Sequence, residues 1–168
     1  MLTKGFSMPT RIFSNITIAI SLSTFGSGVI AQRAPYGLPI TLDQARKVLA
    51  AAEQEAKKNG WPVAIAVLDS GCNLVALEKL DNTNHVSTQI AQDKAWTACA
   101  YRVPTKVVQD LLAKGAENLR YLQLHRMTAV DGAVPIVVDG KLVGAIGVSG
   151  VTSEQDGQVA RAGAESLK

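Results

Sequence analysis

Cysteine, charge and aromatic residues are all scarce in this sequence. Of its 168 residues only 2 are Cys, 18% are charged and 5% are aromatic, whereas 47% are hydrophobic. Two cysteines are too few for a disulfide-stapled scaffold or a four-cysteine zinc site, and the hydrophobic fraction excludes a disordered chain. The length suits a single globular domain.

A basic run is also missing after residue 31. Residues 1–31 hold Lys4 and Arg11 and no acid, which leaves 15 basic against 14 acidic residues in the remainder. A nucleic-acid-binding protein needs a basic face that neutralises phosphates. The sequence therefore predicts no nucleic-acid partner.

Metal-binding and hydrolase motifs are absent. His85 and His125 are the two histidines, and the sequence contains no HxH, HExxH or CxxC spacing and no GxSxG elbow. The sequence therefore predicts neither a closed zinc site nor a Ser-His-Asp hydrolase of the GxSxG type.

The amino-terminal segment has the order of a signal peptide. Lys4 and Arg11 precede an apolar stretch at 12–25, and small residues lead to Ala31. This pattern predicts a signal peptide at 1–31, with cleavage after Ala31 and a periplasmic or secreted product. The alternative is an amphipathic strand at 12–20. Polar residues interrupt the apolar stretch, so we expect no stable membrane insertion.

Export would affect how the two cysteines behave. An oxidising compartment permits a bridge between Cys72, in a turn-like segment, and Cys99, in an apolar run. The default expectation is that no bridge forms, with a buried, inert Cys99 and a half-exposed Cys72. The sequence does not decide between the bridged and the unbridged state.

The body alternates helical and strand patterns. A linker with three residues of Pro or Gly spans 32–40, and the domain follows at 41–168. Thr41 and Gln44 form a capping box, Gly60 ends that helix, and Ser153 with Asp156 is expected to cap the last helix. The expected elements are a helix to residue 59, strands at 63–68 and 74–80, helices at 86–101 and 105–112, an irregular segment at 116–133, strands at 135–138 and 141–148, and a final short helix. The order α-β-β-α-α-β-β-α predicts an α+β fold with an antiparallel sheet flanked by helices.

Three glycines, Gly144, Gly147 and Gly150, precede the last helix. They are compatible with a phosphate-binding loop, but without a Walker lysine the spacing favours close approach of another backbone.

Two segments carry candidate functional residues. Lys94 lies beside an uncharged helical run and is a candidate base or carboxylate anchor, with Asp93 or His85 assisting. The second is the loop at 125–135, whose candidate ligand-binding residues are His125, Arg126, Met127, Gly132, Val134 and Pro135. His85, outside this loop, is a further candidate ligand-binding residue.

Several of these motifs occur in the order found in a known family. The segments at 60–71, 94–98, 134–136, 139–150 and 155–156 resemble the GlcG/HbpS family, and the resemblance covers nearly all of residues 41–163. The resemblance implies a profilin-like sandwich, commonly assembled into octamers, and for some members an exported protein that binds haem. The resemblance does not identify which residue of this chain would ligate the haem iron.

Three hypotheses follow. The first is an exported homo-oligomer that binds haem, with His125 or Met127 on the iron and Arg126 on a propionate. The second is an enzyme acting on a small organic acid through Lys94 and Asp93. The third is an interaction module whose uncharged helix packs subunits together.

Overall fold

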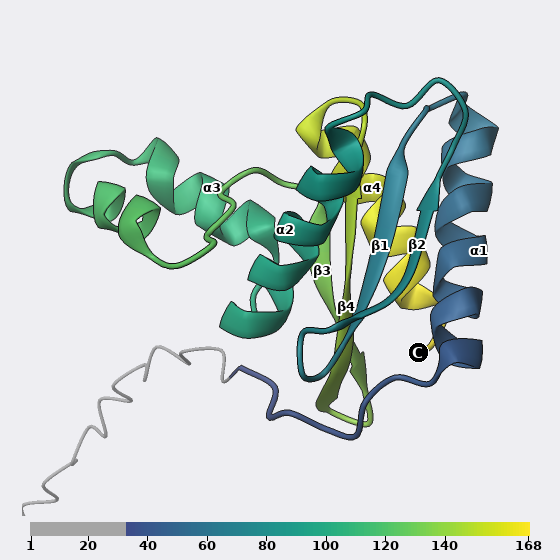
Figure 1. The fold of residues 1–168 in the computed structure, drawn as a ribbon. Helices are drawn as coiled ribbons and strands as arrows, with labels where there is room; N and C mark the ends of the chain where they lie inside the picture. The colour runs from purple at the N-terminus through teal and green to yellow at the C-terminus, as the bar shows by residue number, and fades with distance from the viewer. Residues whose placement is uncertain (1–32) are drawn as a thin grey trace, which may run out of the picture. The chain divides into compact units, whose positions relative to one another are not determined.

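The computed structural model describes residues 33–168, and the predicted signal peptide lies outside these described residues. Figure 1 shows the elements in chain order. They are α1 (Leu42–Asn59), β1 (Ala64–Asp69), β2 (Leu74–Lys79), α2 (Ser87–Tyr101), α3 (Thr105–Ala113), the 3-10 helix η1 (Ala116–Gln123), β3 (Ala133–Val138), β4 (Lys141–Ser149) and α4 (Ser153–Glu165). The predicted α+β class and element order are confirmed. Within the described residues, no helix is both long and apolar enough to cross a membrane.

The four strands form one antiparallel sheet in the order β2-β1-β4-β3. Both hairpins lie where the apolar runs predict them. Asp139 and Gly140 between β3 and β4 have φ values of 49° and 72°. Two positive φ values are what a type I′ hairpin turn requires.

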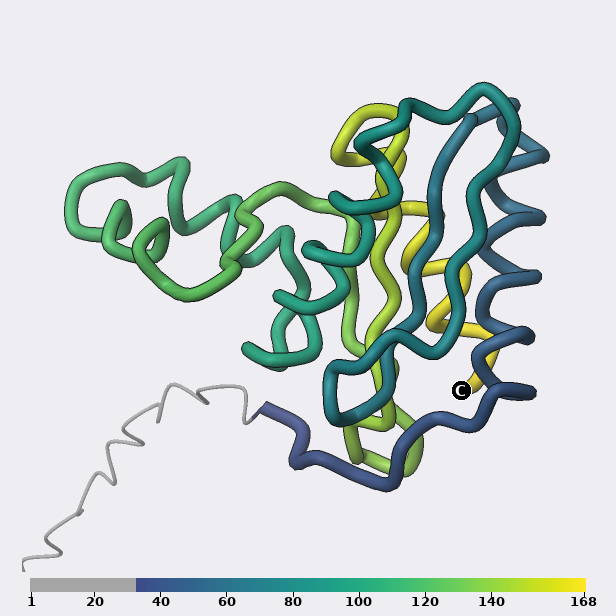
Figure 2. Tube along the Cα trace, viewed as in Figure 1, coloured from purple at the N-terminus to yellow at the C-terminus, as the bar shows by residue number. Residues whose placement is uncertain are grey.

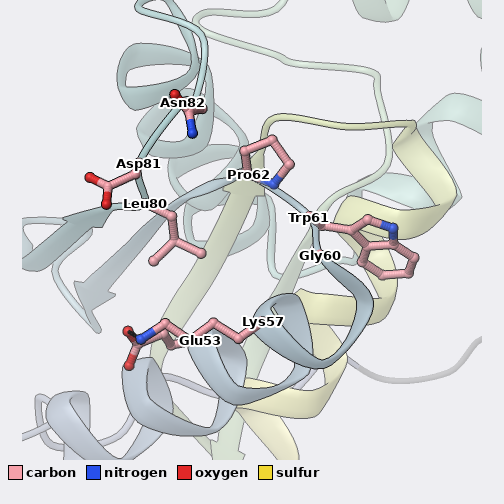
Figure 3. A pocket seen from close by; sticks show the side chains of 8 residues that line it. All are labelled: Glu53, Lys57, Gly60, Trp61, Pro62, Leu80, Asp81 and Asn82. Atoms are coloured by element: carbon pink, nitrogen blue, oxygen red, sulfur yellow. Dashed lines mark ion pairs between the residues drawn. The ribbon is translucent and has the colours of Figure 1, made fainter.

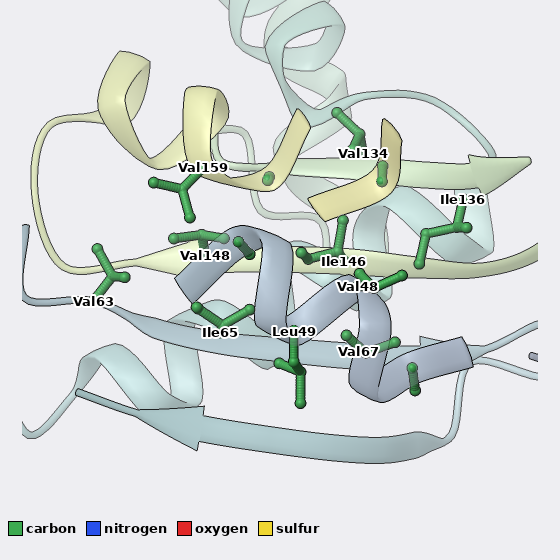
Figure 4. Close-up of a cluster of buried hydrophobic side chains, with 14 of the residues drawn as sticks. Val48, Leu49, Val63, Ile65, Val67, Val134, Ile136, Ile146, Val148 and Val159 are labelled. Carbon is green, nitrogen blue, oxygen red and sulfur yellow. The ribbon is translucent and has the colours of Figure 1, made fainter. Parts of the chain in front are cut away.

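Helix α1 begins and ends at the predicted signals. The Thr41 hydroxyl accepts from the Gln44 N–H and the Gln44 side chain accepts from the Thr41 N–H, and Gly60 adopts a left-handed C-cap. The main hydrophobic core lies between the sheet, α1 and α4, and Figure 4 shows its aliphatic side chains. Large residues such as Ile65 and Ile146 fill this face of the sheet.

Small residues form the opposite face of the sheet, and α2 lies directly on them. Ala64, Ala66 and Ala91 form one buried cluster there. A Cβ at Gly147 would collide with the Ala91 carbonyl oxygen and the backbone of Ala95. The close-packing interpretation of this glycine is confirmed, because α2 approaches β4 at backbone distance.

A disulfide joins the β1–β2 turn to the end of α2. The Cα atoms of Cys72 and Cys99 lie 5.7 Å apart, and Cys99 is fully buried while Cys72 is partly buried. The expected burial of both residues is correct, but the default expectation of two unbridged thiols is wrong. The bridge forms because α2 crosses the sheet face and its last turn reaches the hairpin.

The predicted linker lies along the sheet. The Gly37 N–H donates to the Leu142 carbonyl at 2.7 Å, and Ile40 is buried in the main core. In Figure 2 this segment runs past the β3–β4 hairpin before it enters α1.

The segment at 105–127, which we call the arm, projects away from the sheet (Figure 2). It contains α3 and η1, so residues 116–123, expected to be irregular, form a 3-10 helix. No residue of η1 is buried, and Leu119 and Leu122 are 52% and 60% exposed. The arm adds little to the core of the chain.

Candidate functional site

Helix α2 directs two neighbouring charged residues to opposite sides. Asp93 points outward and is 32% exposed, whereas the Lys94 side chain is 2% exposed. Lys94 shares the inward side of α2 with the alanines that contact the sheet. The two residues predicted to act together therefore do not form one site.

Lys94 forms a buried ion pair with α4. Its Nζ donates to the Asp156 Oδ2 at 2.8 Å, and the Asp156 Oδ1 accepts from the Val151 N–H at 3.2 Å. Burial raises the pKa of the Asp156 carboxyl, and the hydrogen bond from Lys94 opposes that rise. The predicted capping pair of Ser153 and Asp156 is wrong. Thr152 and Gln155 form the capping box instead, because Asp156 points inward to Lys94.

Gly132 is packed against this pair. Its φ is +135°, and a Cβ there would lie 2.6 Å from the Lys94 Nζ and 2.7 Å from the Val148 carbonyl oxygen. Gly132 is therefore a position of close backbone approach. The Lys94 side chain is almost fully buried, so a catalytic role for Lys94 stays a prediction that this burial does not favour.

A cluster on the outer side of α2 brings together Asp93, Trp96, Tyr101, His125 and Arg126, and we call it the Trp96 cluster. Arg126 forms an ion pair with Asp93 at 2.8 Å, and its guanidinium lies 5.0 Å from the Trp96 ring centroid. The rings of His125 and Tyr101 meet Trp96 edge-on, with centroids 5.5 and 6.0 Å away. The sequence predicted Asp93, His125 and Arg126 as site residues. The two aromatic residues, Trp96 and Tyr101, were missed.

Hydrogen bonds from α2 hold the loop of His125 and Arg126. The Tyr101 hydroxyl donates to the His125 carbonyl at 2.8 Å. The Thr97 hydroxyl accepts from the Thr128 N–H at 2.9 Å and lies 3.1 Å from the Arg126 carbonyl oxygen. The loop thus has a defined position on α2, although its own sequence contains no regular pattern.

The chemistry of the Trp96 cluster suits a flat, partly apolar anion. The His125 side chain is exposed and can ligate a metal centre, and Arg126 can pair with a carboxylate. Leu122 and Leu124 nearby in the chain are 60% and 41% exposed. Within residues 33–168 no three His, Cys, Asp or Glu side chains converge as a metal site.

Comparison with known proteins assigns the chain to a family. A family model described as haem degrading protein HbpS-like matches residues 40–165. The chain belongs to this family. It is 40% identical over 110 residues to Protein GlcG of Escherichia coli strain K12, which covers 66% of this chain and 81% of GlcG. The expected GlcG/HbpS relationship is confirmed.

Solved structures share the fold. The crystal structure of HbpS matches with a TM-score of 0.71 and 31% identity, over 79% of this chain and 92% of that chain. A PduOC–haem complex matches with a TM-score of 0.71 over 78% of this chain and 96% of that chain. Its identity of 24% shows a common fold alone.

The remaining predicted residues of this HbpS-like chain are not among the five members of the Trp96 cluster, although Met127 directly follows Arg126 in the chain. His85 is exposed in the turn before α2, where its carbonyl accepts from the Thr88 hydroxyl at 3.2 Å. Met127 is half-buried. Val134 and Pro135 lie in β3 and line a separate pocket of about 260 Å³.

The HbpS-like chain also has a larger pocket, of about 490 Å³, between the end of α1 and the loop after β2 (Figure 3). It contains no predicted site residue. Glu53 and Lys57 pair in its wall, and the hydrogen bond from Lys57 lowers the pKa of Glu53. Burial, together with the nearby Glu53 carboxylate, raises the pKa of Glu78.

Proposed function

We propose that this chain binds haem at the Trp96 cluster. His125 is the proposed iron ligand, with Met127 as the alternative, and Arg126 is the proposed partner of a propionate. The observation that carries the proposal is the exposed imidazole of His125, held edge-on to Trp96 beside a cation. Membership of a family described as haem degrading protein HbpS-like supports it.

The residues present fit the chemistry of haem. Haem has a large apolar face, an iron that accepts imidazole nitrogen, and two carboxylates. Trp96 and Tyr101 supply aromatic contacts and Arg126 supplies a cation in the same cluster. Haem, when bound, supplies an iron centre for redox chemistry, and the chain supplies the ligand, the cation and the apolar contacts.

Asp93 tunes the proposed site. Its carboxylate already pairs with Arg126 at 2.8 Å, and both side chains are partly exposed. A propionate must therefore share Arg126 with Asp93. We expect Asp93→Asn to tighten haemin binding about two- to fivefold, because surface ion pairs contribute up to ~1 kcal/mol.

The direct test is a haemin titration of the purified protein followed by its absorption spectrum. We expect a saturable Soret shift that His125→Ala abolishes or weakens by at least about tenfold. His85→Ala is the matched control, because that histidine is exposed outside the cluster. A shift that His125→Ala leaves unchanged would assign the iron to another ligand, with Met127→Leu as the next variant.

We also propose export and homo-oligomer formation. The signal-like order of residues 1–31 supports export, and the Cys72–Cys99 bridge is typical of an oxidising compartment. The exposed leucines of the arm support self-association. Cell fractionation with amino-terminal sequencing tests cleavage after Ala31, and light scattering tests assembly. A cytoplasmic protein with an uncleaved terminus, or a monomer at micromolar concentration, contradicts the respective proposal.

A further inference from the structure

Arg161 on α4 is held in place by a buried carboxylate. Its guanidinium lies 3.6 Å from the Asp131 Oδ2, and Asp131 is 3% exposed while Arg161 is 49% exposed. Asp131 is itself fixed, because its N–H donates to the Gln109 side chain at 2.7 Å. A buried acid thus sets the direction of a half-exposed cation.

A helical glycine makes this arrangement possible. Gly157 lies within α4, and a Cβ there would collide with the Asp131 Oδ2 and lie 2.9 Å from the Arg161 Nη1. Glycine in a helix interior weakens the helix, so its place here has a local structural cause. Without a side chain at 157, the carboxylate and the guanidinium can both approach α4.

Arg161 also lines the pocket of about 260 Å³ at the edge strand β3. Val134, Pro135, Val137 and Ala164 make apolar walls, and Lys168 and Glu165 lie at the same pocket. Lys168 and Glu165 are paired at 3.5 Å. In the described part of the chain Arg161 forms one ion pair and no further side-chain hydrogen bond, so most of its five N–H donors remain for a ligand.

We propose that this pocket binds a small monocarboxylic acid with a short apolar tail, its carboxylate on Arg161. The planar guanidinium matches a carboxylate, and the valine, proline and alanine walls match a hydrocarbon tail. The volume accommodates a ligand of a few carbon atoms and excludes one the size of haem. The pocket lies where α4 meets β3, whereas the Trp96 cluster lies on α2, so this inference does not depend on haem binding.

Sodium butyrate, butylamine and inorganic phosphate are the probes, each titrated into the 15N-labelled protein at constant ionic strength and followed by NMR. Butyrate and butylamine share a tail and differ in charge, whereas phosphate is an anion without a tail. We expect saturable butyrate shifts at Val137 and Ala164 with a dissociation constant in the millimolar range, as suits so small a ligand. Butylamine and phosphate should produce no such shifts. Phosphate that binds as tightly as butyrate at the same residues would overturn the proposal.

Variants separate the role of Arg161 from general stability. Arg161→Gln should weaken butyrate binding at least about tenfold, because it removes a charge-assisted hydrogen bond to the carboxylate. Arg120→Gln, an exposed arginine of η1, should leave it unchanged. Because Arg161→Gln leaves Asp131 unpaired, Lys168→Glu provides a second variant at an exposed site and should weaken butyrate about threefold. Unchanged butyrate binding in both pocket variants refutes the site.

A competition experiment with haemin distinguishes two sources of the carboxylate in the pocket, a free acid and a haem propionate. Haemin that displaces butyrate from the wild-type protein would mean that the pocket receives a propionate, which overturns the free-acid assignment. Butyrate binding that persists with haemin present, or in a protein that takes up no haemin, supports the free acid.

Discussion

Replacing Lys94 by methionine tests how much the buried ion pair contributes. Lys94 and Asp156 are 2% and 3% exposed and their charged atoms are 2.8 Å apart. Methionine keeps an unbranched, apolar side chain, so the variant mainly removes the charge. Leaving a buried carboxylate without its partner typically costs about 3–5 kcal/mol. That is a large part of the 5–15 kcal/mol by which domains are usually stable.

The measurement is urea unfolding followed by circular dichroism, with the free energy of unfolding taken from linear extrapolation. We expect Lys94→Met to lower it by about 3–5 kcal/mol. The double variant Lys94→Met/Asp156→Asn should recover most of that loss, because it removes the unpaired charge and keeps an acceptor for the Val151 N–H. Lys106→Met breaks an exposed pair with Asp110 and should leave the free energy of unfolding nearly unchanged.

The pH dependence of Lys94→Met gives an independent result. Burial already raises the pKa of Asp156, and losing Lys94 raises it further. The folded state then binds a proton more tightly than the unfolded state. Stability should therefore increase as pH falls from neutral through the raised pKa, and decrease again as pH rises. A loss below about 1 kcal/mol in the single variant, or no recovery in the double variant, would refute the reasoning.

Three further predictions concern the scaffold. Replacing Cys72 and Cys99 by serine should lower the free energy of unfolding by about 3.5 kcal/mol, from the loop entropy of a 27-residue separation, and reductant should reproduce the loss in the wild type. Gly147→Ala should cost about 1–3 kcal/mol in urea unfolding, because its Cβ enters the backbone of α2, and an unchanged midpoint would contradict that contact. The raised pKa of Glu78 means that its ionisation destabilises the fold as pH rises above 4.5. Glu78→Gln should therefore raise the melting temperature at pH 7 and remove this pH dependence, whereas a lower melting temperature would oppose it.

Local signals account for most of the predictable fold. Thr41 with Gln44 and the left-handed Gly60 bound α1, and the Asp139-Gly140 turn joins β3 to β4. Each of these signals acts through atoms within four residues, so the sequence alone contains the needed information. The 3-10 helix at 116–123 carries no comparable signal, and it was expected to be irregular.

The site was less predictable because its contacts join distant segments. Lys94 and Asp156 are 62 positions apart, and Arg126 and Asp93 are 33 apart. Lys94, Asp93 and Arg126 were candidate site residues by their type, whereas Asp156 was expected only to cap a helix. No local pattern indicates which partner each of them meets. Trp96 was missed because it lies in an uncharged run expected to be mostly buried. The residue type alone does not distinguish a tryptophan at a half-exposed helix position from one in a core.

The small residues beneath α2 connect the scaffold to the candidate site. Gly147 lets the backbone of α2 approach β4, and at this separation Lys94 lies beneath the surface and reaches Asp156. The same approach fixes the rotation of α2, which directs Asp93 and Trp96 outward, where they hold Arg126. A larger residue at 147 would therefore do more than reduce stability. Because it must shift α2, it should also weaken haemin binding at a cluster that it does not touch, whereas an equally destabilising change in the core beneath α1 should not.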